Sequence, residues 1–438
     1  MIMNDATQID ILAARHVTLD LVSHVLERKR ALDEALDSHR GLAALEDRDR
    51  GFARLLCLTV LRRLNQLDEV IGRCLARPLP VKAQKVQSVL RLGAAQLLFL
   101  GTPAHAAVDT TVELAKALDL SAHVKLINAI MRRLTREGAD WVAAQDEAAL
   151  ALPPWLWARW QASYGEATAR QMVLAMLEEP PLDLSVAGDP AIWVDVLEAV
   201  SLPTGGLRRA GGINVADLPG FESGEWWVQD AAASLAVPLL GEVRGLRIAD
   251  LCAAPGGKTL QLAARGARVT ALDRSAKRLE RLRDNLARCH AEAEVLVADA
   301  VRWSPAELFD GILLDAPCTS TGTLRRHPDA AWLKRPEDIA NLSRTQDGLL
   351  RASLSLVKPG GLIVYCVCSV EPEEGPRRIE DLLASGLPVE RVPVQADEIG
   401  GRAECLTPEG DVRTLPHHLA ELGGMDGFYA ARLRKQSS

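Results

Sequence analysis

The chain has 438 residues, more than one ordinary hydrophobic core accommodates, so we expect about two to four domains. Hydrophobic residues make up 48% of the sequence and charged residues 25%, a balance that is typical of soluble globular proteins. No apolar run is long enough to cross a bilayer, and the N-terminal segment, which contains Asp5, Asp10 and Asp20, lacks a signal-peptide pattern. We therefore expect a cytoplasmic protein without a membrane segment.

The formal net charge of −7 argues against a generally basic surface, but the charge is unevenly distributed. Residues 1–140 carry 20 Lys and Arg against 17 Asp and Glu, which permits a contact with nucleic acid at this end of the chain. Eight cysteines are scattered without a Cys-x-x-Cys pair, so neither a zinc ribbon nor a disulfide framework is indicated. We expect free thiols and no metal.

A helical pattern extends from residue 9 to about residue 136, because apolar residues recur three and four positions apart without strand-like alternation. Breaks at Gly41 and at two proline-containing segments divide the region into about five to seven helices. The pattern predicts an all-α bundle over residues 1–140.

Three stretches of this bundle carry a recognisable motif pattern, namely residues 90–100, 103–116 and 124–134. They resemble the NusB family of RNA-binding helical bundles, and the similarity covers most of residues 8–138. The resemblance implies contact with RNA, although many such domains serve only as docking modules.

The helical pattern continues after residue 140 and changes character at Pro180-Pro181. Short strands are expected at residues 182–186, 213–218 and 226–228, with a helix near residues 191–199. Residues 141–228 are therefore predicted to form a helical linker and a small α/β subdomain.

From residue 229 to residue 438, strands and amphipathic helices alternate regularly, which predicts a doubly wound, mainly parallel sheet of seven strands. The expected strands are residues 246–250, 268–272, 294–297, 311–315, 362–367, 389–394 and 427–433. Ligands of such sheets bind at the carboxyl ends of the strands.

Residues 248–259 change from strand composition through a glycine turn to a helix that opens at Lys258. The absent side chains of Gly256 and Gly257 let a ligand approach the backbone, and the positive end of the helix dipole faces it. A phosphate-binding loop would need a glycine where this chain has Cys252, and the dinucleotide fingerprint G-x-G-x-x-G is also missing. A turn without a ligand stays open as an alternative.

An acid or a thiol follows each of the next strands: Asp273, Asp299, Asp315 with Cys318, and Cys366 with Cys368. Asp273 follows Asp250 by 23 residues, close to the spacing of about 20 at which a second-strand carboxylate binds ribose hydroxyls. Asp299 is expected beside the adenine edge, unless these aspartates only cap helices. The pattern predicts an adenosine-containing ligand.

Two thiols at neighbouring strand ends suit covalent catalysis, in which one sulfur attacks and another group helps to release the product. A zinc site would need three or four ligands, and no histidine lies near Cys366 or Cys368 in the sequence. We assign Cys368 to the chemistry and interpret Cys366 as a packing residue.

A second resemblance rests on residues 250–259, 315–322, 325–329, 358–361, 368–369 and 424–430. These motifs are similar to those of the NOL/NOP/Sun family of RNA cytosine-5 methyltransferases, over roughly residues 150–435. The resemblance implies a Rossmann-like domain dependent on S-adenosylmethionine, with Cys368 as nucleophile, although Val367 replaces the usual threonine before it, and with Cys318 in product release. It places cofactor contacts on Cys252, Ala253, Ala254, Pro255, Gly256, Gly257, Lys258, Asp273, Asp299 and Asp315.

Together with the NusB-like region, the motifs resemble the branch of that family whose target is cytosine 967 of 16S ribosomal RNA. The resemblance implies an unpaired or flipped cytosine, reached before full subunit assembly, with Arg325, Arg326 and His327 available to hold the RNA backbone. Two alternatives stay open: the same chemistry on transfer RNA or another ribosomal cytosine, and a non-catalytic RNA-binding assembly factor. The sequence predicts no oligomeric state.

Overall fold

The computed structural model describes residues 5–212 and 214–437, with only the backbone described for residues 5–10. The chain divides into two compact units, each with its own core: Met1–Leu177 with His327–Lys334, and Glu178–Arg326 with Arg335–Ser438. No helix in the described part of the chain is long and apolar enough to cross a membrane.

The first unit is all-helical, as the sequence predicts. Its α-helices are α1 (Asp5–Leu26), α2 (Leu32–Ser38), α3 (Arg40–Ala43), α4 (Asp47–Arg62), α5 (Leu64–Arg73), α6 (Gln84–Leu98), α7 (Ala104–Ala117), α8 (Val124–Ala143), α9 (Glu147–Ala151), α10 (Pro154–Tyr164), α11 (Glu166–Leu177) and α15 (Ala330–Leu333). The described chain forms eight α-helices up to α8, one more than the upper limit expected, and the break assigned to Gly41 lies at His39. The His39 side chain accepts a hydrogen bond from Leu42 N and so starts the one-turn helix α3.

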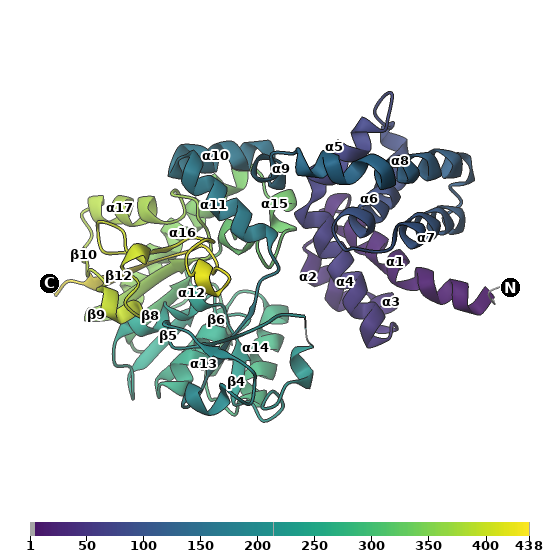
Figure 1. Cartoon of the computed structure of the whole chain (residues 1–438). Helices are drawn as coiled ribbons and strands as arrows, with labels where there is room; N and C mark the ends of the chain where they lie inside the picture. The colour runs from purple at the N-terminus through teal and green to yellow at the C-terminus, as the bar shows by residue number, and fades with distance from the viewer. Residues whose placement is uncertain (1–4, 213, 438) are drawn as a thin grey trace. The chain divides into compact units, whose positions relative to one another are not determined.

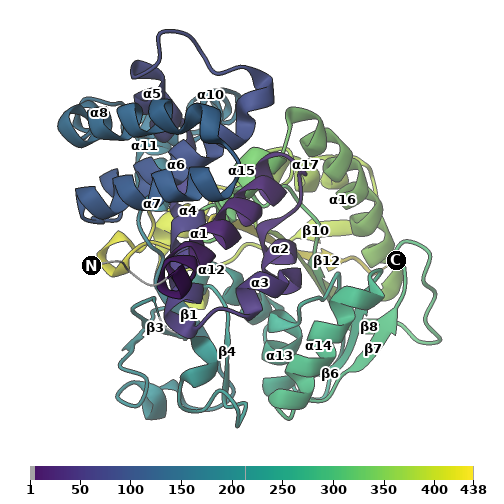
Figure 2. The same cartoon turned by 90° about the vertical axis from the view of Figure 1, so that its right-hand side faces the viewer.

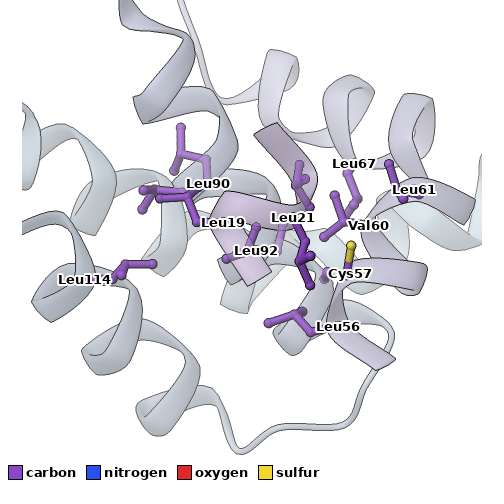
Figure 3. Close-up of a cluster of buried hydrophobic side chains, with 14 of the residues drawn as sticks. Leu19, Leu21, Leu56, Cys57, Val60, Leu61, Leu67, Leu90, Leu92 and Leu114 are labelled. Carbon is purple, nitrogen blue, oxygen red and sulfur yellow. The ribbon is translucent and has the colours of Figure 1, made fainter. Parts of the chain in front are cut away.

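Leucine and valine side chains from α1, α4, α5, α6 and α7 meet in the core of this unit (Figure 3). Helices α6, α7 and α8 lie side by side (Figure 2). Gly93 lets α6 approach its neighbours closely, because a Cβ there would lie only 2.5 Å from Thr111 Oγ1. The segment that contains α15 is fixed to the bundle: Trp332 Nε1 donates to Leu61 O at 2.8 Å, and Asp329 Oδ2 accepts from Leu32 N at 2.9 Å.

The second unit begins with a small antiparallel sheet in the order β2-β3-β1-β4. Its strands are β1 (Leu182–Val186), β2 (Val200–Ser201), β3 (Leu207–Arg209) and β4 (Trp226–Val228). The strand expected at residues 213–218 is wrong: residue 213 lies outside the described residues, and Val215–Asp217 is a 3-10 turn. The two edges of β1 are already paired with β3 and β4, so no edge of β1 is left for it.

The helix expected near residues 191–199 is also wrong, since only a 3-10 turn, Pro190–Trp193, forms there. Glu198 has a φ of 49°, a left-handed backbone conformation that a right-handed helix cannot contain. The apolar residues of this segment, Leu197 and Ala199, still pack into the core of the small sheet.

The large sheet has the order β10-β12-β9-β8-β5-β6-β7, with β11 paired to β12. Its strands are β5 (Arg247–Leu251), β6 (Arg268–Asp273), β7 (Glu294–Val297), β8 (Phe309–Asp315), β9 (Val357–Val367), β10 (Val389–Arg391), β11 (Val412–Thr414) and β12 (Phe428–Lys435). The predicted seven strands are all present. The short strand β11, which the sequence pattern misses, makes an eighth.

Strands β7, β6, β5, β8 and β9 are mutually parallel, and β12 returns antiparallel to β9. Helices α13 (Gly257–Ala264) and α14 (Ala276–Arg288) cover one face, while α16 (Pro336–Leu356) and α17 (Pro376–Ala384) cover the other (Figure 1). This is the expected Rossmann-like, doubly wound arrangement, and it brings the carboxyl ends of five strands to one edge.

Neighbouring leucines on α4 provide a matched test of the helical core. Leu56 has no exposed surface, whereas 39% of Leu55 is exposed. We expect Leu56→Ala to lower the free energy of unfolding by about 2–5 kcal/mol, because it leaves a cavity, and Leu55→Ala to lower it by less than about 1 kcal/mol. Urea denaturation followed by circular dichroism measures both values. Equal losses in the two variants would contradict the packing of α4.

Candidate active site

A pocket of about 600 Å³ lies at the carboxyl edge of the parallel strands, a size that suits a small-molecule ligand. Seven of the residues expected at the site line it: Cys252, Ala254, Asp273, Asp299, Asp315, Cys318 and Cys368. The other five expected residues do not line it: Ala253, Pro255, Gly256, Gly257 and Lys258. The tertiary structure thus brings strand ends that are over 100 residues apart into one pocket.

In the turn after β5, Gly256 is required by the backbone conformation and by close packing, and it leaves little open space for a ligand. Gly256 has a φ of 108°, and a Cβ there would lie 3.0 Å from Leu282 Cγ of α14. Cys252 also adopts a positive φ, 63°, as the chain leaves the strand. Helix α13 starts at Gly257, one residue before the expected position. The turn is therefore covered by α14 on one side and contributes Cys252 and Ala254 to the pocket.

Two of the predicted acids differ in exposure. Asp273 is buried, and its Oδ1 accepts a hydrogen bond from Ser275 N at 2.9 Å. Its Oδ2 is buried without a hydrogen-bond donor; Arg278 Nη1 lies 3.2 Å away, close enough for charge attraction but without hydrogen-bond geometry. A buried acceptor that faces a pocket suits a ligand with a hydroxyl group that can donate a hydrogen bond, such as a ribose. Asp299 is more exposed and accepts from Val301 N at 3.1 Å.

Asp250, on the buried side of β5, does not line the pocket. It accepts a hydrogen bond from Thr259 Oγ1 at 2.6 Å, and burial raises its pKa to about 7. This contact ties the end of β5 to α13 and so fixes the turn between them.

Asp315 and Lys258 form an ion pair at the end of β8, with 2.7 Å between Nζ and Oδ2. Burial works against the charged amine, but the neighbouring carboxylate outweighs it, so the pKa of Lys258 is raised. The buried thiol of Cys366 lies 3.7 Å from Asp315 Oδ1. Lys258 therefore reaches the site through Asp315 and holds that carboxylate in place.

The sulfurs of Cys318 and Cys368 are 3.5 Å apart. The hydrogen bond between them lowers the pKa of Cys368 although burial opposes it, and the same bond, together with burial, raises the pKa of Cys318. Within the pair, these two directions favour the proton on Cys318 over the proton on Cys368. No group of three or more His, Cys, Asp or Glu side chains suited to a metal ion occurs among the described residues.

Sequence reasoning assigned no role to Ser320 and Glu374, which surround the two thiols. Ser320 adopts a φ of 59° and places its Oγ 3.5 Å from the Cys368 sulfur. Glu374 is fully buried and bonds to the residues that follow each cysteine. Ser320 lies inside the motif of residues 315–322, so the sequence could have indicated it as a site residue. Glu374 lies outside the motifs, and only folding brings it next to the two thiols.

The RNA contacts expected of Arg325, Arg326 and His327 are only partly compatible with the structure. Arg325 is buried with 1% exposure and donates to Gly423 O at 2.6 Å, so it cannot contact RNA. His327 belongs to the helical unit. Arg326 keeps 34% of its side chain exposed while its Nε donates to Asp426 at 2.9 Å.

Comparison with known proteins assigns both parts of the chain. Residues 12–136 match the model of the NusB family, and residues 238–434 match the model described as 16S rRNA methyltransferase RsmB/F. The ribosomal RNA small subunit methyltransferase B of Erwinia tasmaniensis is 36% identical over 439 residues, covering 96% of this chain and 98% of the relative. The chain belongs to the ribosomal RNA small subunit methyltransferase B family.

Other members agree: the Xylella fastidiosa protein is 36% identical and covers 98% of this chain and 99% of its own length. The resemblances stated from the sequence motifs are thereby confirmed, and S-adenosylmethionine is the cofactor that membership of this methyltransferase family implies.

Solved structures extend the comparison to the fold. The crystal structure of PH0851 has a TM-score of 0.74 at 22% identity and covers 99% of this chain and 100% of that chain. A methyltransferase homolog protein from Pyrococcus horikoshii has a TM-score of 0.53 at 28% identity, covering 64% of this chain and 93% of that chain. Both similarities agree with the doubly wound sheet.

Labelling with iodoacetamide tests where the proton of the thiol pair lies. Because the pKa of Cys368 is lowered and that of Cys318 raised, Cys368 should react at lower pH than Cys318 in the folded protein. Cys318→Ala removes the hydrogen bond and should move the labelling midpoint of Cys368 to higher pH. Peptide mass spectrometry between about pH 6 and pH 10 measures both sites. Faster labelling of Cys318 across that range would contradict the assignment.

Proposed function

We propose that the protein transfers a methyl group from S-adenosylmethionine to carbon 5 of a cytosine in 16S ribosomal RNA. In this proposal Cys368 is the nucleophile and Cys318 acts in product release. The observation that carries it is the distance of 3.5 Å between the two sulfurs, in a pocket that Asp273 and Asp315 also line. The names of the full-length relatives support ribosomal RNA as the substrate, and the motif resemblance supports position 967.

Carbon 5 of cytosine is a poor nucleophile, so the ring must be activated first. The Cys368 thiolate attacks carbon 6, a carbon–sulfur bond forms, and the electron pair of the C5–C6 double bond makes carbon 5 nucleophilic. Asp315, held by Lys258, binds the N3 and amino edge of the ring and stabilises the adduct as it forms.

S-adenosylmethionine, when bound, supplies the methyl group from its positively charged sulfonium centre. The residues proposed to hold it are Asp273, whose buried Oδ2 lacks a hydrogen-bond donor, Asp299 and the turn that starts at Cys252.

Release of the product requires removal of the proton on carbon 5. Once Cys368 is bonded to carbon 6, its negative charge no longer raises the pKa of Cys318, which can then lose its proton to solvent. Cys318, or a water that it positions, takes the carbon 5 proton; the C5–C6 double bond forms again, and Cys368 leaves as a thiolate.

The target cytosine must be unpaired or flipped out, because Cys368 lies inside a pocket. Arg274, Arg302 and Arg344 line the same pocket and supply positive charge suited to phosphate groups. Arg326, anchored through Asp426, is the member of the expected Arg325–His327 contact group that we retain as an RNA contact.

Replacement of the nucleophile tests the proposed reaction. Cys368→Ala should abolish 5-methylcytosine formation while leaving S-adenosylmethionine binding intact, because only the sulfur that attacks is removed. Bisulfite sequencing of 16S ribosomal RNA from a deletion strain carrying each variant measures the first effect, and isothermal titration calorimetry measures the second. Cys289→Ala, a half-buried cysteine outside the pocket, is the matched control. Normal methylation by Cys368→Ala would refute the role of this residue.

Replacement of the release residue should have a different result. In Cys318→Ala the attack can still occur but the carbon 5 proton stays, so a covalent enzyme–RNA species should accumulate. A gel under denaturing conditions with labelled RNA detects it, and the double variant Cys318→Ala, Cys368→Ala should show none. If no denaturation-resistant adduct forms with Cys318→Ala, product release has to be assigned to another group.

A further inference from the structure

A buried carboxylate, Glu374, lies behind the two thiols and bonds to both of the loops that carry them. Its Oε1 accepts from Thr319 N at 2.9 Å, and Thr319 is the residue after Cys318. Its Oε2 accepts from Ser369 Oγ at 2.6 Å, and Ser369 is the residue after Cys368. One side chain therefore fixes the backbone next to each cysteine.

The sheet alone does not hold these loops. From Gly311 and Leu362, strands β8 and β9 stay in register up to Asp315 and Cys366, and Ala316 N still donates to Cys366 O at 2.9 Å. The next backbone bond between the two segments is from Gly322 N to Cys368 O at 3.1 Å. Cys318 lies between these two backbone hydrogen bonds, where hydrogen bonds to Glu374 take the place of strand pairing.

The same interval is braced from α16. Gln346 Nε2 donates to Pro317 O at 2.9 Å and to Glu374 Oε1 at 3.2 Å. The Thr319 hydroxyl donates to Glu374 Oε2 at 2.5 Å. Glu374 thus faces donors from three segments, and no cation forms an ion pair with it among the described residues.

Four hydrogen-bond donors favour the charged carboxylate, while burial opposes it and raises the pKa of Glu374. The negative charge in turn disfavours a thiolate at Cys318: it adds to the hydrogen bond with Cys368 and to burial, which raise the pKa of Cys318. The carboxylate acts on the release thiol both through geometry and through charge.

We propose that Glu374 is a positioning residue that fixes the Cys318 loop against Cys368 through its hydrogen bonds to Thr319 and Ser369. The inference rests on the proposed function, because it concerns how the two thiols divide their roles. Glu374 does not touch the pocket, so it acts on the reaction only through the two cysteine loops.

The test compares Glu374→Gln with the parent enzyme. Gln keeps the size of the side chain but removes the charge and replaces one acceptor with a donor. We expect kcat to fall by about ten- to a hundred-fold with an unchanged KM for S-adenosylmethionine, since a small displacement of a reacting group costs up to about a hundred-fold. A covalent enzyme–RNA species should accumulate although Cys318 is present, and iodoacetamide should label a larger share of Cys318 relative to Cys368.

Glu373→Gln is the matched control, because it removes the same charge at the adjacent position, where the carboxylate pairs with Arg377. If Glu374→Gln fails to fold, Thr319→Val and Ser369→Ala each remove one hydroxyl bond to Glu374 and should lower kcat in the same direction by a smaller factor. Parental kcat and labelling in a folded Glu374→Gln, or in both substitute variants, would overturn the inference. A parent enzyme that forms no 5-methylcytosine would instead overturn the proposed function.

Discussion

The parallel register between β8 and β9 is the constraint on which the candidate site depends. Asp315 of β8 pairs with Cys366 of β9, and both strands leave the sheet close to this pair. The two segments that leave there carry Cys318 and Cys368, and their sulfurs meet at 3.5 Å. A one-residue shift would exchange the side chains of a strand between the two helix-covered faces and would separate Asp315 from Cys366, so the thiol contact depends on this register.

A buried network of charges also supports the loop that follows Cys318. Asp183 of β1 pairs with Arg208 of β3 at 2.6 Å, and Arg325, seven residues after Cys318, lies between Asp230 and Asp426. Removing one partner of such a pair leaves an uncompensated buried charge, which typically costs about 3–5 kcal/mol. The RNA-contact role that the sequence suggests for Arg325 is therefore replaced by a structural one. The small sheet contributes to the same network through Asp183, because Asp183 Oδ2 also accepts from Ala231 N at 2.9 Å.

The segment His327–Lys334 shows that domain membership does not follow chain order. It lies between two stretches of the methyltransferase unit but packs into the helical unit, where Trp332 donates to Leu61 O. The chain passes from the loop of Cys318 to this segment within about ten residues, and Arg326, at the boundary, is held by Asp426. A division of the chain at residues 140 and 228 assigns this segment to the methyltransferase domain. The four residues of α15 are too few to show an apolar pattern that would indicate packing against the helical bundle.

The sequence by itself determined the helical bundle, the alternation of strands and helices and the position of acids and thiols at strand ends, because these follow from local periodicity and from motifs of adjacent residues. Tertiary structure alone decided that the sulfurs of Cys318 and Cys368 lie 3.5 Å apart, that Gly256 faces Leu282, and that Glu374 joins the two loops. Burial and contacts between residues 26 to 55 positions apart set these properties. Neither has a local signature in the chain, so the residues around a nucleophile can be named from sequence only when they lie inside its motif.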